Sequence, residues 1–208
     1  MHYLPMKNNY RLYSLLLLLF CACTKEVVTT QPEKQPAAIP PPVTSNYIEY
    51  TIIKGEHYCD KNNFVPIDYQ ALSFNVRFDS SAMYTSIAAE NQYDINKLYG
   101  FSDNQAHHQE YSARFGWRWS DNALYLFAYV YNNGVRSSEV LGAVPLNTAV
   151  HCGLTVSGNQ YVFTLNGKTT VLPRMAKTQR ALGYKLYPYF GGDETAPHTI
   201  RIRIDEQN

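Results

Sequence analysis

The sequence has little that would indicate a helical, nucleic-acid-binding or membrane-spanning protein. Almost no stretch shows the 3.6-residue periodicity of an amphipathic helix, and no internal repeat typical of a propeller is present. The formal net charge of the 208 residues is only +1, and no run of Lys and Arg occurs, which argues against nucleic acid as a partner. The apolar run at residues 12–20 is too short to span a bilayer as a stable anchor.

The first residues have the pattern of a targeting signal, with Lys7 and Arg11 ahead of the apolar run. The small Ala22 directly before Cys23 resembles the lipobox of bacterial lipoproteins, in which the cysteine is lipidated and becomes the mature N-terminus. This resemblance implies a signal peptide over residues 1–22, a lipid anchor at Cys23 and a place in the bacterial cell envelope, on the outer membrane. An ordinary secretory signal that contains cysteines is the alternative.

A linker and one domain follow the signal. Residues 23–45 contain the lipidated cysteine and a Pro-rich stretch without apolar periodicity, which predicts an extended linker. The globular domain is expected over residues 46–208, where Cys59 and Cys152 are the only cysteines. A disulfide between these two is one interpretation, because the predicted compartment is oxidising, and a buried pair of free thiols is the other.

From residue 47 onwards the chain is rich in short runs of Tyr, Phe, Val, Ile and Thr, which suit a half-buried strand. About ten strands are predicted, at residues 47–54, 71–79, 111–120, 123–131, 150–156, 161–165, 168–172, 186–190 and 199–204, with one more through Val140 and Val144. Between residues 81 and 103 the pattern weakens and indicates one short helix or a long ordered loop. The fold class predicted from this pattern is all-β, an antiparallel sandwich or barrel.

Several motifs together resemble a known group of proteins. They are HYCD, LSFNVRFD, NKLYGFSD, SARFGWRW, YNNG and LYPYFGGDETAPH. The order is similar to that in lipoproteins of the Bacteroidetes type, whose domains are assigned to the concanavalin A-like lectin/glucanase superfamily. The resemblance extends from about Tyr47 to Ile204. It implies a jelly roll with two curved sheets and a concave face that often serves glycans, but it implies no particular activity.

The glucanases of family sixteen on this fold arrange their carboxylates as E-x-D-x-x-E along one strand, so that two of them flank a sugar bond. No such string occurs in this sequence. Asp193 and Glu194 are adjacent, would point to opposite faces of a strand, and lie beside two glycines. A turn with solvated acids is therefore expected there, and a hydrolase of this type is disfavoured.

Alginate-lyase-like enzymes on the same fold are the main enzymatic alternative. They need a Tyr, a His, an Arg and an amide around a uronate. Tyr189, Arg114, Gln109 and either His107 or His108 are candidates for these roles. However, the Q-[IV]-H strand of such lyases is absent and the segment HHQE is predicted to be a loop. The sequence therefore favours a binding protein over an enzyme, and a polysaccharide lyase is the alternative.

Metal sites receive little support. His107, His108 and Glu110 are close in sequence, but adjacent histidines on extended backbone diverge, so a solvated loop is expected instead. Four oxygen-bearing side chains could contribute to calcium binding, although the spacing of a calcium loop is not met: Asp94, Asn96, Asp103 and Asn104. No cofactor and no metal ligands are predicted, and a structural calcium ion stays unassigned.

Aromatic and basic residues that alternate with apolar ones point to a carbohydrate-binding face. Residues 111–120 carry two arginines on the face opposite their aromatic core residues, and residues 123–131 carry tyrosines opposite theirs. The predicted glycan-binding residues are Arg114, Arg118, Tyr125, Tyr129, Tyr187 and Tyr189. The arginines favour an acidic polysaccharide. Packing of these residues under loops, in a structural or protein-interaction module, is the open alternative.

Overall fold

The computed structural model describes residues 46–207. The predicted signal peptide, the predicted lipidation site at Cys23 and the predicted Pro-rich linker lie outside the described residues. Among residues 46–207 no helix is long and apolar enough to cross a membrane.

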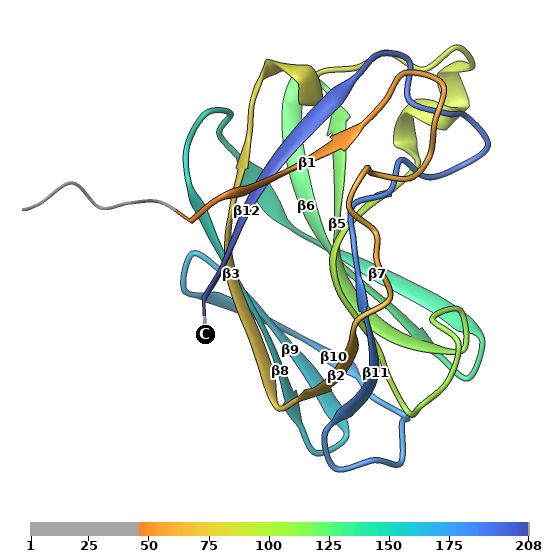
Figure 1. The fold of residues 1–208 in the computed structure, drawn as a ribbon, viewed down its shortest axis with the longest axis vertical. Coiled ribbons are helices and arrows are strands. Elements are labelled where there is room, and N and C mark those ends of the chain that lie inside the picture. The colour runs from red at the N-terminus through yellow and green to blue at the C-terminus, as the bar shows by residue number, and fades with distance from the viewer. Residues whose placement is uncertain (1–45, 208) are drawn as a thin grey trace, which may run out of the picture. The chain divides into compact units, whose positions relative to one another are not determined.

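Twelve strands and two short 3-10 helices make up the domain (Figure 1). In chain order they are β1 (Ile48–Ile52), β2 (Pro66–Tyr69), β3 (Ala71–Phe78), η1 (Ser80–Ala82), η2 (Ala89–Tyr93), β4 (Asn96–Ser102), β5 (Tyr111–Ser120), β6 (Ala123–Asn132), β7 (Val135–Val144), β8 (Val150–Ser157), β9 (Gln160–Leu165), β10 (Lys168–Pro173), β11 (Ala181–Leu186) and β12 (Ile200–Gln207).

The strands form two antiparallel sheets of six strands each, stacked as a sandwich (Figure 1). The first sheet has the order β1-β12-β3-β8-β9-β10, and the second has the order β2-β11-β4-β5-β6-β7. The predicted all-β antiparallel sandwich is thereby confirmed. The last strand of the chain lies inside the first sheet, between β1 and β3, as its clean alternation of isoleucines requires.

The core lies between the two sheets, and it is built by period-two alternation. In β3 every second residue is buried, and the same holds in β8 and β12. β5 contributes Phe115 and Trp117 to the core, and β6 contributes Leu126 and Val130. The intervening residues of β5 and β6 therefore point to the outer face of the second sheet, because successive side chains alternate across a strand.

Three strands of the second sheet differ from the sequence prediction. β4 occupies part of the segment expected to be a helix or loop, and its register shifts between Lys97 and Gly100, which breaks the alternation. β2 is only four residues long and was not predicted. β11 ends at Leu186, so residues 187–190 are not the predicted strand but an extended segment with an isolated bridge at Tyr189.

The two cysteines of the domain are free thiols, and both are buried. Cys59 forms an isolated β-bridge through its backbone with Ile52 of β1, whereas Cys152 lies in β8. Cys59 pairs with β1 on the side away from β12, so four inter-strand spacings of about 4.8 Å separate it from β8, or about 19 Å in total. This distance is well over twice the separation that a disulfide allows between Cα atoms. The structure therefore contains the free-thiol alternative and not the bridge. Burial raises the pKa of Cys59 to about 11.

Candidate functional site

A groove of about 480 Å³ crosses the outer face of the second sheet. Its floor comes from β4, β5 and β6, through Lys97, Arg114 and Tyr129. Residues 184–189, at and beyond the end of β11, form one side together with the loop that carries Tyr58 and Phe64. The groove therefore draws on parts of the chain that lie far apart in sequence.

Arg114 lies at the centre of the floor, opposite Gly100 of β4 and Tyr129 of β6. A Cβ added to Gly100 would overlap the backbone and side chain of Arg114, so the glycine is what allows the arginine to lie so deep. Arg114 is only 7% exposed, and its Nε has no hydrogen-bond partner. Within the part of the chain that the structure describes, no carboxylate forms an ion pair with it. Burial lowers the pKa of Arg114 to about 10, which leaves it charged at neutral pH.

Lys97 is the second cation of the floor. Its Nζ lies 5.4 Å from the ring centre of Tyr129 and 5.9 Å from that of Tyr189, and Arg114 Cζ lies 5.7 Å from the same Tyr129 ring. No ion pair or hydrogen bond of the Lys97 amine is found among residues 46–207. Burial, and after it the charge of Arg114, lowers the pKa of Lys97 to about 8. Two neighbouring positive charges thus share one floor without an ion pair to a carboxylate, although the charge of Asp94 partly opposes the lowering of the Lys97 pKa.

Tyrosines surround the guanidinium of Arg114. The ring centres of Tyr129 and Tyr131 are 5.9 Å apart in an edge contact. The ring of Tyr189 stacks on that of His57, with 5.2 Å between the ring centres and an angle of only 9° between the rings. Burial raises the pKa of Tyr129 and of Tyr189, so both hydroxyl groups stay protonated at neutral pH. These rings provide flat apolar faces together with hydroxyl donors.

One end of the groove contains a histidine held by a tyrosine. The backbone N–H of His108 donates to the hydroxyl of Tyr184 at 3.1 Å, and Nδ1 of its ring lies 2.9 Å from the same oxygen. Burial, then Arg114 and His107, lower the pKa of His108 to about 4. The ring of His108 is therefore neutral at pH 7, beside the charged guanidinium of Arg114.

Four of the six predicted glycan-binding residues line this groove: Arg114, Tyr129, Tyr187 and Tyr189. Tyr187 and Tyr189 were expected to share one face. However, the ring of Tyr187 packs at 5.9 Å from the core ring of Tyr99, whereas the ring of Tyr189 contacts His57. The two rings have different surroundings because the chain has left β11 before Tyr187 and no longer alternates as a strand.

Arg118 and Tyr125 lie outside the groove, although they share the outer face of the sheet with Arg114 and Tyr129. Arg118 donates to the carbonyl oxygen of Tyr93 at 3.0 Å and to Ser120 Oγ at 3.1 Å. Its guanidinium also lies 4.9 Å from the ring centre of Phe127. The segment that contains η2 thus binds Arg118, which is the loop-packing alternative for this part of the face.

Five residues that line the groove were not predicted from the sequence as site residues: Lys97, Tyr131, Tyr184 and the loop residues Tyr58 and Phe64. The motif NKLYGFSD contained Lys97, but the bulge that follows it hides the alternation that would have predicted its direction. The loop residues carry no periodic signal at all. By contrast, all four kinds of side chain proposed for a lyase line the groove, namely Arg114, His108, Gln109 and Tyr189. His107 lines a separate shallow depression.

Two of the acidic residues considered from the sequence, Glu194 and Asp103, have structural partners. Glu194 accepts hydrogen bonds from the backbone N–H groups of Ile87 and Ala88, at 2.8 Å and 2.7 Å, and these bonds lower its pKa. It therefore closes the loop before η2. In the described part of the chain, no three His, Cys, Asp or Glu side chains converge as metal ligands.

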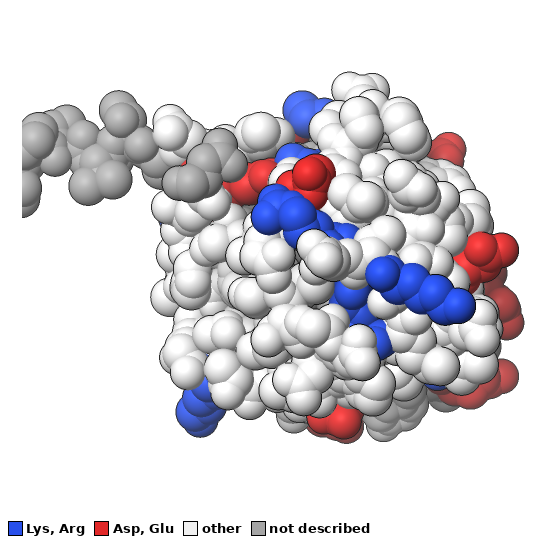
Figure 2. All heavy atoms as spheres, turned by 90° about the horizontal axis from the view of Figure 1, so that it is seen from below, with Lys and Arg blue, Asp and Glu red and all other residues white. Residues whose placement is uncertain are grey.

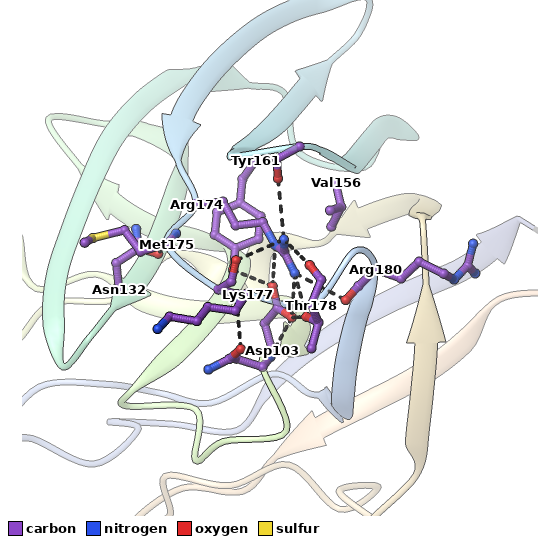
Figure 3. A network of polar contacts seen from close by, with 12 residues as sticks. Asp103, Asn132, Val156, Tyr161, Arg174, Met175, Lys177, Thr178 and Arg180 are labelled. Atoms are coloured by element: carbon purple, nitrogen blue, oxygen red, sulfur yellow. Dashed lines mark hydrogen bonds and ion pairs between the residues drawn. The ribbon is translucent and has the colours of Figure 1, made fainter.

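Asp103, one of the four oxygen-bearing side chains considered for calcium, is fully buried in an ion-paired network (Figure 3). Its carboxylate accepts from Arg174 Nε at 2.7 Å, from Arg174 Nη2 at 3.1 Å and from the hydroxyl of Tyr161 at 2.7 Å. Arg174 also donates to the backbone carbonyl oxygens of residues 178 and 180. The network fastens residues 174–180 to the end of β4. Arg174 is thus a buried arginine with a structural role, because a carboxylate balances its charge. Arg114 forms no such ion pair among residues 46–207.

Comparisons with known proteins define the fold and nothing more specific. No model of a known protein family matches the sequence, and no curated protein matches it. Solved structures do match. The alginate lyase AlyC3 is 13% identical over 77% of this chain and 74% of its own, with a TM-score of 0.52.

Two further structures agree with that match. The complex of AlyC3 with dimannuronate is 12% identical over 77% of this chain and 73% of its own, with a TM-score of 0.53. The catalytic domain of an endo-1,3-beta-glucanase (laminarinase) from Thermotoga petrophila RKU-1 is 11% identical, covers 77% and 75% of the two chains, and has a TM-score of 0.51. The domain therefore has the concanavalin A-like jelly-roll fold of such lyases and glucanases. At these identities the likeness is one of fold alone.

Proposed function

We propose that the groove binds an acidic polysaccharide, with Arg114 and Lys97 as the carboxylate-binding residues. The observation that carries the proposal is the pair of cations on the groove floor, neither of which forms an ion pair with a carboxylate among residues 46–207. Burying a charge without a partner costs free energy, so such a pair is unfavourable in a domain that only has to fold. A ligand carboxylate would supply the missing acceptor.

The chemistry of the groove fits a uronate residue better than a neutral sugar. The planar guanidinium of Arg114 can donate two parallel hydrogen bonds to one carboxylate, and the Lys97 amine can donate to the same group or to a neighbouring one. Tyr129 and Tyr189 offer ring faces for the C–H surface of a pyranose. Among the proteins of similar fold, AlyC3 is described as an alginate lyase and was solved with dimannuronate, which supports the acidic class.

The affinity of this site is expected to be modest. A hydrogen bond to a charged group contributes about 1.5–3 kcal/mol, and a stacked ring contributes about 1 kcal/mol. Association costs several kcal/mol, so dissociation constants from micromolar to millimolar are expected. The face drawn in Figure 2 is mostly uncharged, and its basic side chains gather near the middle with acidic side chains beside them and along one edge, so that charges of both signs occur together on that face. Binding is therefore expected to depend on the groove itself.

Titration calorimetry with mannuronate oligomers tests the proposal, with neutral 1,3-linked glucose oligomers of equal length as the comparison. The acidic oligomers should bind and the neutral ones should not. Arg114→Met and Lys97→Met should each weaken binding at least tenfold, because each removes a charged donor. Arg118→Met is the matched control, since Arg118 lies on the same face but outside the groove, and it should bind normally. Equal binding of neutral oligomers, or full binding by Arg114→Met, would contradict the proposal.

A polysaccharide lyase is the second candidate, and His108 is the specific observation in its favour. A lyase removes the proton from the carbon beside the uronate carboxylate. That electron pair forms a carbon–carbon double bond, the neighbouring glycosidic carbon–oxygen bond breaks, and the leaving oxygen takes up a proton. The neutral ring of His108, hydrogen-bonded to Tyr184 near Arg114, provides a base and an acid of the required kind.

The two candidates are separated by the ultraviolet absorbance of the unsaturated product. An enzyme should generate it from uronate polymers, and His108→Ala or Tyr184→Phe should abolish turnover while calorimetric binding persists. Binding without any product in the native protein would assign the groove to binding alone. Absence of both would favour the third class, a structural or protein-interaction module.

We propose in addition that the domain is held in the bacterial cell envelope by a lipid on Cys23, at the outer membrane. The support comes from the sequence, through the lipobox-like Ala22-Cys23 and the resemblance to lipoproteins of the Bacteroidetes type. A Pro-rich linker over residues 23–45 would give the groove reach from the membrane towards a polymer.

A further inference from the structure

The groove is long, and its two ends can be located from the strand pairing. At one end Tyr58 bridges to Tyr189, and Tyr189 bridges to Lys97 of β4. At the other end the backbone N–H of Tyr184 donates to the side chain of Ser102 of β4 at 2.9 Å. Lys97 and Ser102 are five residues apart in one strand, which corresponds to about 16 Å at the rise of a β-strand.

The loop between β1 and β2 follows this length along one wall of the groove. It begins beside the first end with Tyr58 and reaches the second end with Phe64, whose ring lies 5.4 Å from that of Tyr184. The Tyr58 ring is in edge contact with Tyr189 at 4.9 Å. Arg114 lies between the two ends, opposite Gly100, and the Lys97 side chain extends from the first end so that its amine approaches the same Tyr129 ring as Arg114 does. The two cations therefore lie between two aromatic pairs, with Tyr58 and Tyr189 at the first end of the groove and Phe64 and Tyr184 at the second.

Tyr58 and Phe64 are unusually accessible for residues of their size. Tyr58 is 63% exposed and Phe64 is 75% exposed, although both line the groove. Large aromatic rings that stay in water contribute little to the stability of the fold, and exposed apolar surface beside a polar groove is typical of a binding site. Each ring contacts one tyrosine of the groove with its edge or face and leaves area free for a ligand.

From this arrangement we propose that the groove takes an internal stretch of an acidic chain at least three sugar residues long, with Tyr58 and Phe64 as stacking platforms for the outer residues. The central residue places its carboxylate on Arg114 and Lys97. The inference therefore rests on the proposed function, and it adds the length of the ligand and the residues that bind its outer sugars. A single uronate could occupy only the middle of a groove of this length.

A series of mannuronate oligomers from the dimer to the hexamer, titrated into the whole protein, tests the inference. Affinity should rise about tenfold between the dimer and the tetramer and then level off, because the longer chain engages both aromatic platforms whereas the dimer engages at most one. In a variant with both Tyr58→Ala and Phe64→Ala, the tetramer should bind only as well as the dimer does. The affinity of the dimer itself should fall less than that of the tetramer, because the dimer loses at most one stacking contact.

Two controls keep the outcome interpretable. Tyr93→Ala removes a ring of comparable exposure that lies outside the groove, and it should retain the gain with chain length. Tyr58→Phe, combined with the native Phe64, keeps the stacking face and should also retain it. Equal affinity for the dimer and the hexamer in the unaltered protein, or a persistent gain in the double variant, would overturn the inference and leave the proposed function intact. Failure of every oligomer to bind would overturn both.

Discussion

Replacing Arg114 with Met should not destabilise the domain, although Arg114 is among its most deeply buried charged residues. The guanidinium has no carboxylate partner among residues 46–207, and burial lowers its pKa to about 10. A depression of this size corresponds to roughly 3 kcal/mol of unfavourable burial of the charged form. Met preserves most of the apolar stem of the side chain. We expect the free energy of unfolding of Arg114→Met to rise by about 1–3 kcal/mol.

Arg174→Met is the matched comparison, because Arg174 is equally buried but fully paired with Asp103. Its removal leaves the Asp103 carboxylate in the core without its counter-ion. A change of this kind typically costs about 3–5 kcal/mol. The two substitutions are chemically identical, but only Arg174→Met removes the counter-ion of a buried carboxylate. They should therefore change the free energy of unfolding in opposite directions.

The assay is urea unfolding at pH 7, followed by tryptophan fluorescence and by far-ultraviolet circular dichroism so that two-state behaviour is checked. Uronate binding is measured on the same samples. The expected pattern for Arg114→Met is greater stability with lost binding, which marks a residue retained for function. A loss of more than about 1 kcal/mol for Arg114→Met would show that its guanidinium makes a stabilising interaction in the free protein. The argument for an anion-binding site would then fail.

Three further outcomes are expected. Lys97 is positively charged below its pKa of about 8 and neutral above it, so calorimetry should show uronate affinity falling as pH rises through about 8 to 9, and Lys97→Met should abolish that step. Thiol labelling of denatured, unreduced protein should titrate both Cys59 and Cys152, whereas the folded protein should react slowly because both are buried; a single disulfide would contradict the structure. Cys23→Ala should leave the protein unprocessed or release it from membranes, and continued partition into detergent with normal processing would rule out the lipid anchor.

The sequence determined most of the first sheet and the centre of the second. Alternation over residues 71–79, 111–120 and 123–131 predicted β3, β5 and β6 and the faces they bury. Such patterns can be read from sequence because the two-residue period of a strand is local, and burial of one face fixes which residues carry it. β4 escaped prediction because its bulge interrupts that period, and β2 because four residues are too few to show one.

The sequence alone could not determine which outward-facing residues form a site. Arg114 and Arg118 have the same alternation in the same strand, yet Arg114 lies in the groove and Arg118 is bound by the segment around Tyr93. Likewise Arg174 is paired with Asp103, 71 residues away, while Arg114 has no such partner. The local pattern sets only the direction of a side chain. Whether a loop covers it, or an opposite charge meets it, depends on contacts between distant parts of the chain, and these exist only in the folded structure.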